Sequence, residues 1–167
     1  RLWSWQRPQF LAPFVDPAGP FPPLPTEGLA FGGDESARYL GRGWSGHEGS
    51  WRWTDGAHAI VRFAGPPPGA TELVLQLAAR PYLGGGRLAA QRAVVTLNAQ
   101  QIQTLELDRP RTANYELIVP ARLIQAQNTL RFDLPEAANP ADLEKTGDHR
   151  QLGIAVTALR WRRRPTP

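Results

Sequence analysis

The fold is decided by the stretch Arg92-Ala93-Val94-Val95-Thr96-Leu97-Asn98-Ala99-Gln100-Gln101-Ile102-Gln103-Thr104-Leu105-Glu106-Leu107. Two short runs rich in β-branched and aliphatic residues, 92–97 and 102–107, flank the polar segment 98–101. Runs of this length, bounded by Asn and other turn-forming residues, are typical of neighbouring antiparallel strands. The stretch therefore predicts a β-hairpin whose loop is Asn98-Ala99-Gln100-Gln101.

The same pattern recurs on both sides of this hairpin. Further strands are expected at 38–44, 50–54, 57–63, 72–79, 115–119, 129–134 and 152–161. The segment 65–69, Gly-Pro-Pro-Pro-Gly, forces a turn, and 120–127 fits one helical turn. No amphipathic stretch of ten or more residues is present to supply the crossover helices of a doubly wound α/β fold. The sequence predicts an all-β protein, a two-sheet antiparallel β-sandwich of the jelly-roll type.

One domain is expected, because 167 residues close one hydrophobic core but not two. We divide the chain into a lead-in at 1–28, the β-sandwich domain at 29–163 and a tail at 164–167. The lead-in is rich in proline, which excludes a helix or a central strand, so it is expected to lie extended along the domain. Three of its side chains are expected to pack on the domain: Phe10, Phe14 and Phe21. Since the chain starts at Arg1 and contains no Met, we expect it to be a segment of a longer protein.

The net charge of +4 is concentrated at the ends of the chain. Six of the 19 basic residues lie within 1–7 and 160–164, segments that hold no acidic residue, so 8–159 carries 13 basic against 15 acidic residues. The body of the domain is therefore not a basic surface, and we predict no nucleic-acid partner. Both ends also contain tryptophan, and mixed Trp and Arg are typical of membrane interfaces. Contact with a membrane surface through these ends is one hypothesis; the alternative is that Trp161 closes the core and the arginines are solvated.

No catalytic motif is present. The sequence lacks the nucleophile elbow, the P-loop, the dinucleotide-binding fingerprint and the zinc-binding helix motif, and without cysteine it has no thiolate nucleophile or ligand. His47 and His149, with Glu48 and Asp148, have no spacing that argues for a metal site, and nothing in the sequence demands a structural calcium ion. We therefore predict no enzymatic activity, no metal and no cofactor.

The segment 41–56, Gly-Arg-Gly-Trp-Ser-Gly-His-Glu-Gly-Ser-Trp-Arg-Trp-Thr-Asp-Gly, contains three of the six tryptophans of the chain. Sugar-binding sites combine an exposed indole, which stacks on the C–H face of a sugar ring, with carboxylate or guanidinium groups that hydrogen-bond to hydroxyls. The segment supplies all of these groups. Trp51 and Trp53 also alternate on one face of a strand, and Trp44 is suited to cap the core, so at least one of the three is expected to be structural.

The order of several motifs resembles that of a β-sandwich domain appended to bacterial envelope glycosyltransferases and related polysaccharide-assembly proteins. The resemblance covers about 30–161 and is carried by Gly43-Trp44-Ser45, Glu48, Trp51-Arg52-Trp53-Thr54, Asn139-Pro140 and Asp148-His149-Arg150-Gln151-Leu152-Gly153-Ile154-Ala155-Val156. It implies a jelly-roll fold like that of carbohydrate-binding modules, without catalysis. The segment Ser45-Gly46-His47 departs from the pattern, in which an aromatic residue and prolines are common.

The positions that match this pattern imply a ligand-binding set: Trp44, Glu48, Trp53, Asp148 and Arg150. An alternative is that Asp148 and Arg150 form ion pairs with Glu48 and Arg52 that pin two loops together. A buried arrangement of this sort would be costly to break on one side.

The resemblance implies a non-catalytic, carbohydrate-binding-like accessory domain of a larger bacterial cell-envelope glycan-processing protein, on the periplasmic or extracytoplasmic face. Its partner would be a polysaccharide or a lipid-linked sugar, engaged through Trp44, Glu48 and Arg150. The competing hypothesis is a structural docking domain that packs on its parent membrane domain or on a partner subunit and binds no sugar. That hypothesis predicts an exposed apolar patch.

Overall fold

The computed structural model describes residues 20–66 and 72–164. The expectations for Phe10, Phe14, the Trp/Arg segment 1–7 and the end of the tail fall on residues outside these ranges. Within the described ranges there are ten strands: β1 (Leu29–Ala30), β2 (Trp44–Glu48), β3 (Trp51–Asp55), β4 (His58–Ala64), β5 (Leu73–Pro81), β6 (Gln91–Leu97), β7 (Gln100–Leu107), β8 (Ala113–Val119), β9 (Gln127–Asp133) and β10 (Leu152–Arg163). Four short helical segments join them: the 3-10 turns η1 (Asp34–Tyr39), η2 (Gly84–Gly86) and η3 (Ala121–Leu123), and one α-helical turn, α1 (Pro140–Leu143).

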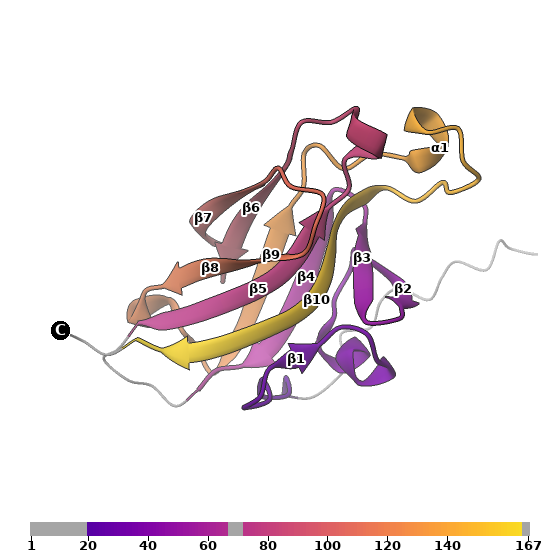
Figure 1. The fold of residues 1–167 in the computed structure, drawn as a ribbon. Coiled ribbons are helices and arrows are strands. Elements are labelled where there is room, and N and C mark those ends of the chain that lie inside the picture. Colours follow the sequence, from indigo (N-terminus) through magenta and orange to yellow (C-terminus); the bar gives the residue numbers. More distant parts are fainter. Residues whose placement is uncertain (1–19, 67–71, 165–167) are drawn as a thin grey trace, which may run out of the picture.

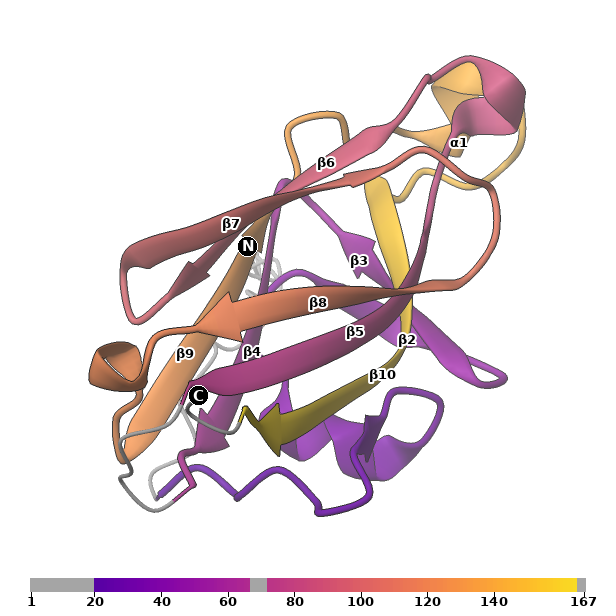
Figure 2. The same ribbon diagram turned by 60° about the vertical axis from the view of Figure 1, so that its left-hand side comes forward.

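The strands form two sheets that pack face to face (Figures 1 and 2). The larger sheet has the order β2-β3-β10-β5-β8, with β1 paired to β10, and the smaller sheet has the order β4-β9-β6-β7. Every strand pair within the two sheets is antiparallel. The predicted two-sheet antiparallel β-sandwich is confirmed.

The core lies between the sheets because apolar side chains alternate along the strands. In β5, Leu73, Leu75 and Leu77 point inward and are almost fully buried, as the burial of every second residue requires. They face equally buried side chains of the smaller sheet, among them Phe63 and Phe132. In Figure 1, no helix or strand of the described ranges lies over the opposite face of the larger sheet, which is called the outer face below.

The hairpin at 92–107 is confirmed, but its loop is shorter than expected. Asn98 and Ala99 alone form the turn, with φ of 48° and 66°, and β7 begins at Gln100. Positive φ at both central residues is the turn geometry whose twist matches that of the flanking strands. The Asn98 side chain stabilises the turn by accepting from the backbone N–H of Thr129 at 2.8 Å.

The strand expected at 38–44 is wrong. Residues up to Tyr39 form the 3-10 turn η1, which begins where the Ser36 hydroxyl donates to the Gly33 carbonyl oxygen at 2.7 Å. The strand β2 begins only at Trp44, because Gly43 has φ of +91°, outside the extended region. The turn buries Tyr39, whose hydroxyl donates to the Pro23 carbonyl oxygen at 2.9 Å.

A β-bulge in β10 connects the core to the loop that precedes this strand. The register against β3 shifts between Leu152 and Ala155, so Gly153 and Ile154 lie opposite Thr54. The Thr54 hydroxyl is fully buried and accepts from the backbone N–H groups of both residues, at 3.2 and 3.0 Å. Thr54 therefore fixes the point at which the chain leaves the 148–151 loop and enters the sheet.

The two ends of the described chain lie against the sandwich. Leu24, in the described part of the lead-in, is buried, and Phe21 lies beneath the Arg62 guanidinium at 5.8 Å. Trp161 is partly buried and packs against the core, while Arg162 pairs with Glu116 at 3.0 Å. None of the helices in the described ranges is long and apolar enough to cross a membrane.

Candidate functional site

Two tryptophans stand on the outer face at β3. Alternation along this strand buries Arg52 and Thr54 on the inner side and leaves Trp51 and Trp53 partly exposed on the other. Glu48 of β2 lies directly opposite Trp51 in the register, so its side chain shares this face. The end of β2 thus places a carboxylate beside the indoles of β3.

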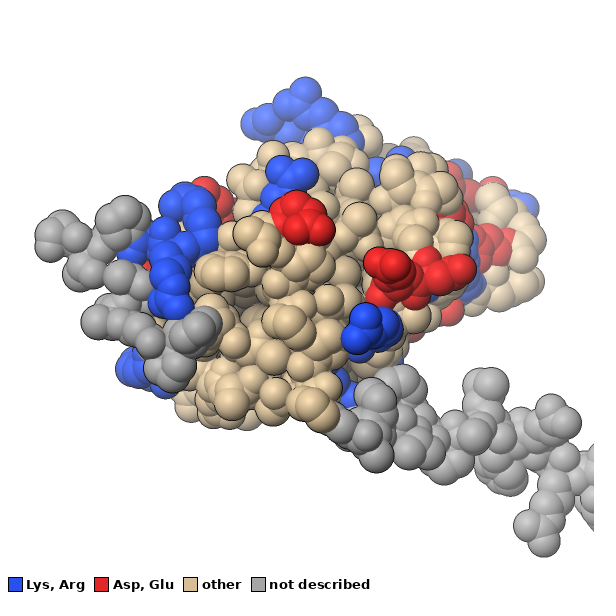
Figure 3. Space-filling model, turned by 90° about the horizontal axis from the view of Figure 1, so that it is seen from below, with Lys and Arg blue, Asp and Glu red and all other residues tan. Residues whose placement is uncertain are grey.

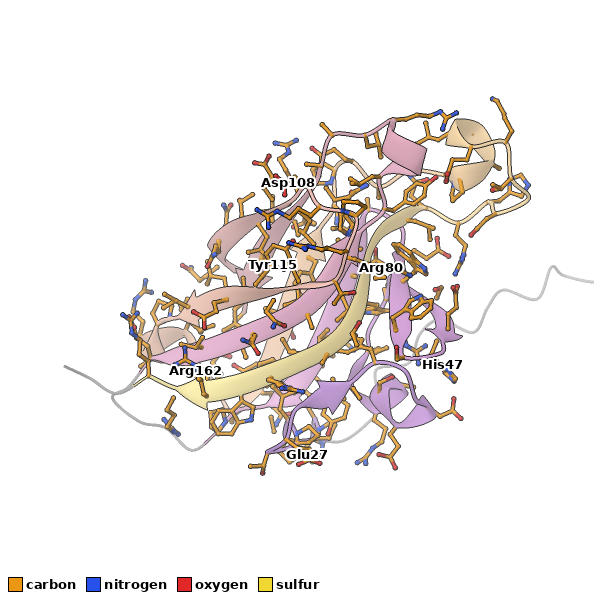
Figure 4. The ribbon with its side chains drawn as sticks, viewed as in Figure 1. Glu27, His47, Arg80, Asp108, Tyr115 and Arg162 are labelled. Atoms are coloured by element: carbon orange, nitrogen blue, oxygen red, sulfur yellow. The ribbon has the colours of Figure 1, made fainter. Side chains whose placement is uncertain are left out.

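Arg80 of β5 reaches the same two indoles from across the sheet. Ala155 of β10 is paired with Trp53 on one side and with Arg80 on the other, and its small side chain leaves room for Arg80 to extend over it. The guanidinium carbon lies 4.7 Å from the Trp51 ring centroid and 5.2 Å from that of Trp53, within the range of cation–π attraction. Figure 4 shows Arg80 at one end of the sheet and Arg162 toward the other.

Tyr82 completes the aromatic part of the site. Its ring meets Trp53 edge to face, with centroids 6.3 Å apart and an interplanar angle of 87°, a favourable geometry for aromatic pairs. Its hydroxyl donates to Glu144 at 2.7 Å. Burial and this hydrogen bond raise the pKa of Tyr82 to about 12. Tyr82 is therefore a neutral, oriented support for Trp53.

Arg150 joins two carboxylates next to the indoles. It binds Asp148 through two nitrogens, at 3.0 Å from Nε and 2.7 Å from Nη2, and Glu48 through Nη1 at 2.6 Å. Hydrogen bonding by Arg150 holds the pKa of Asp148 below its ordinary value. The side chains of Arg150, Asp148 and Glu48 keep 31%, 29% and 42% of their surface exposed, so the ion-paired groups still face solvent.

Ser45 links this ion-paired group to the backbone of β3 at Trp53. Its hydroxyl lies 3.2 Å from Arg150 Nη1 and 3.2 Å from the Trp53 carbonyl oxygen. We call the six side chains gathered in this way the outer-face cluster: Glu48, Trp51, Trp53, Arg80, Asp148 and Arg150.

The structure places Trp44 on the opposite side of its sheet. Its ring lies 5.2 Å from that of Phe31, and its indole N–H donates to the Ile60 carbonyl oxygen at 2.9 Å. Trp44 pairs with Thr54, whose side chain is buried, so both point toward the core. Its expected role in capping the core is seen in these contacts, whereas its contact with a ligand stays a prediction.

The alternative of ion pairs among Asp148, Arg150, Glu48 and Arg52 is seen for the first three residues but not for Arg52. Arg52 lies on the other face of β3, where it is 8% exposed. It donates to the Ser45 carbonyl oxygen at 2.9 Å and to the Ser36 hydroxyl at 3.1 Å. Burial lowers the pKa of Arg52. Arg52 is excluded from the ion-paired group because side chains alternate along a strand: Trp51 and Trp53 face outward, so Arg52 between them faces inward.

The histidines do not gather into a metal site. His47 contacts Asp34 at 3.0 Å, His58 hydrogen-bonds to Asp133 on the smaller sheet, and His149 is exposed. Within 20–66 and 72–164, no three His, Cys, Asp or Glu side chains are placed so that they would hold a metal ion.

A cavity lies at the end of the sandwich remote from the outer-face cluster. It has a volume of about 170 Å³ beside Trp161 and is lined by Pro23, Leu24, Phe63, Ala64, Gly65, Pro66, Leu73 and Trp161. The view from below shows an extended uncharged surface at this end, with charged residues mostly toward its margins (Figure 3). Because this lining offers no charged group and little hydrogen-bonding capacity, the cavity lacks the polar groups that fix a sugar.

Of the five predicted ligand-binding residues, Glu48, Asp148, Arg150 and Trp53 come together on the outer face, and Trp44 lies apart from them. Sequence reasoning did not include Arg80, Tyr82 or Glu144. Alternation along 73–81 does assign Arg80 to the outer face, but only the pairing of β3, β10 and β5 brings it to the tryptophans.

No protein-family model matches the sequence, and no curated protein matches it significantly. Among solved structures, the chain is similar to a family GH115 4-O-methyl-α-glucuronidase with specificity for decorated arabinogalactans, at a TM-score of 0.51 and 10% identity over 78% of this chain. The chain spans only 17% of that enzyme's length.

The chain is also similar to two carbohydrate-binding modules. One is a family 35 module from an environmental isolate, with a TM-score of 0.43 and 18% identity, covering 84% of this chain and 89% of the other. The second is the CBM36-1 domain of a multidomain xylanase from the hindgut metagenome of Trinervitermes trinervoides, with a TM-score of 0.46, 12% identity and coverage of 84% and 95%. At such low identities, what the chain shares with part of the glucuronidase is the β-sandwich fold.

Proposed function

We propose that this chain is a non-catalytic carbohydrate-binding domain and that the outer-face cluster is its sugar site. The observation that carries the proposal is the placement of two partly exposed indoles, Trp51 and Trp53, between an arginine on one side and an ion-paired carboxylate group on the other. Sugar rings present apolar C–H faces edged by hydroxyls. An indole contacts the face, and charged side chains hydrogen-bond to the edge.

The polar half of the cluster is already ordered before any ligand binds. Arg150 is held by Asp148, Glu48 and Ser45 at once. Side chains that are already fixed lose little conformational entropy when a ligand arrives, which favours binding. Both carboxylates retain oxygen lone pairs that can accept hydrogen bonds from vicinal hydroxyls.

The same contacts argue against glycoside hydrolysis. Hydrolysis needs one carboxyl group that is protonated at the working pH, which requires a raised pKa. The pKa of Asp148 is instead lowered by Arg150, and Glu48 is paired with the same guanidinium. Asp148 is therefore suited to accept hydrogen bonds rather than to donate a proton.

The proposal extends to the setting inferred from the sequence resemblance. There the domain is an accessory part of a larger bacterial envelope protein, at the periplasmic or extracytoplasmic face, and its ligand is a polysaccharide or a lipid-linked sugar. The arginines at 160–164, beside the partly buried Trp161, would then lie near the membrane surface.

Tryptophan fluorescence of the full chain, titrated with a panel of neutral and acidic bacterial envelope glycans, tests the proposal. A saturable change that is lost in Trp53→Ala and kept in Trp161→Phe supports it, since Trp161 lies at the other end of the sandwich. Circular dichroism checks that both variants fold. If no glycan changes the fluorescence of the folded wild type, the sugar-binding proposal fails and the docking hypothesis takes its place.

A further inference from the structure

Arg80 differs from Arg150 and Arg52 in its hydrogen-bonding partners. It is partly buried on the outer face, and its guanidinium lies over Trp51 and Trp53. It makes no hydrogen bond or ion pair with any residue in 20–66 or 72–164. Arg150, by contrast, is shared between two carboxylates, and Arg52 binds backbone oxygens and a hydroxyl.

Contact with the indoles leaves the hydrogen-bonding capacity of Arg80 unused. A cation–π contact engages the charge of the guanidinium, whereas its N–H groups point outward in its own plane. A partly desolvated guanidinium that lacks an acceptor is a strong binding group for an anion, and its fork geometry matches a carboxylate. The two rings hold this fork in one place.

We propose that Arg80 makes the outer-face cluster selective for acidic saccharides, by binding the carboxylate of a uronic acid residue in a two-pronged hydrogen bond. The inference rests on the proposed function and names the substrate class of that site. The pyranose ring that carries the carboxylate contacts the exposed parts of Trp51 and Trp53. Its hydroxyls are hydrogen-bonded by the ion-paired group of Glu48, Asp148 and Arg150.

The charges of the cluster fit such a ligand. Glu48 and Asp148 have Arg150 as a common counter-ion, so they do not need Arg80. The formal charges of the four ionised side chains of the cluster sum to zero. Arg80, the positive one at the tryptophans, has no acidic partner among the residues of 20–66 and 72–164. A ligand carboxylate placed there gains a full ion pair in a partly desolvated position, where such a pair is stronger than in water.

The test is isothermal titration calorimetry of the full chain with oligosaccharides of galacturonic acid and of glucuronic acid, each compared with its methyl ester. The ester keeps the sugar ring, removes the negative charge and adds one methyl group. The expected result is that at least one of the two acids binds roughly 10- to 100-fold more tightly than its ester. A sulfated galactan oligosaccharide is a further arm, because sulfate carries the charge without the planar carboxylate.

Three variants assign the effect to Arg80. Arg80→Gln is expected to lower the affinity for the acid roughly tenfold or more and to abolish the preference over the ester. Arg80→Lys retains the charge but lacks the fork, so it is expected to restore only part of the affinity. Arg162→Gln, which removes an outer-face arginine at the far end of the sheet, is the matched control and is expected to change affinity less than twofold.

Four outcomes overturn the proposal while leaving sugar binding intact. They are equal binding of acid and ester by the wild type, an acid preference that survives Arg80→Gln, sulfated galactan binding that equals that of the uronates, and binding of neutral glycans but of neither uronate. If neither neutral nor acidic glycans bind the folded protein, the proposed function itself fails.

Discussion

Replacing Thr54 by Val tests whether the bulge in β10 is held as the structure describes. Val has nearly the same shape but lacks the hydroxyl that accepts from the N–H groups of Gly153 and Ile154. Each buried donor left facing a methyl group costs about 1–3 kcal/mol. The change is therefore expected to lower the free energy of unfolding by roughly 2–5 kcal/mol, after a small gain from the added apolar surface.

Urea unfolding monitored by circular dichroism measures this loss, which corresponds to a fall in Tm of roughly 5–15 °C for a domain of this size. The matched control is Thr96→Val, at a partly exposed position on the outer side of β6, where the change is expected to stay within about 0.5 kcal/mol. If Thr54→Val is as stable as the wild type, the hydroxyl does not satisfy these two amides, and the account of how the 148–151 loop is anchored is wrong.

Three further predictions follow from local geometry. Arg150→Gln is expected to cost about 1–2 kcal/mol, discounted for solvent screening. The hydrogen bonds from Arg150 that lower the pKa of Asp148 stabilise the fold fully above the unfolded pKa of this carboxyl, near 3.9. This stabilisation is lost as the pH falls through the lower folded pKa, so the free energy of unfolding of the variant should depend less on pH below about 4. Gly43→Ala is expected to abolish folding, because a Cβ there would lie 1.7 Å from a backbone oxygen of β4 and the φ of Gly43 is +91°. The control is Gly46→Ala, whose Cβ would meet nothing within 4 Å, and the yields of folded protein of the two variants are compared. Because the pKa of Tyr82 is raised to about 12, its neutral hydroxyl stabilises the fold fully below the pKa of the unfolded state, near 10, and the stabilisation is lost as the pH rises through 12. Ultraviolet absorbance should show a tyrosinate step near pH 12 that is missing in Tyr82→Phe.

The sequence was sufficient for most strands because their apolar side chains alternate. Val61 and Phe63 mark β4 in this way, and the same rule assigns Arg80 to the outer face and Arg52 to the inner one. The alternative that included Arg52 in the ion-paired group with Asp148, Glu48 and Arg150 is wrong, because alternation along β3 turns Arg52 inward. The 3-10 turn at 34–39 was missed because buried Tyr39 satisfies a strand pattern equally well.

The site is built from residues that lie far apart in the sequence, and local sequence patterns do not predict which of them meet. Arg80 meets Trp53 only because Ala155 pairs with both, which joins three strands separated by long stretches of sequence. Glu48 and Arg150 are 102 residues apart, and their ion pair forms because the 148–151 loop is anchored beside β2. The tryptophan-rich segment indicated where to look, but the register of the sheet decides which of its indoles face the solvent.

The most direct test of the sugar-binding account is the side-chain indole N–H region of the nitrogen–proton correlation spectrum of the labelled full chain, recorded with and without neutral and acidic glycans. The chain has six tryptophans, and single Trp→Phe variants assign their signals. The account predicts that at least one glycan shifts the signals of Trp51 and Trp53 in a saturable manner and leaves those of Trp44 and Trp161 in place. Shifts confined to Trp44 or Trp161, or no shift with any glycan, would contradict it.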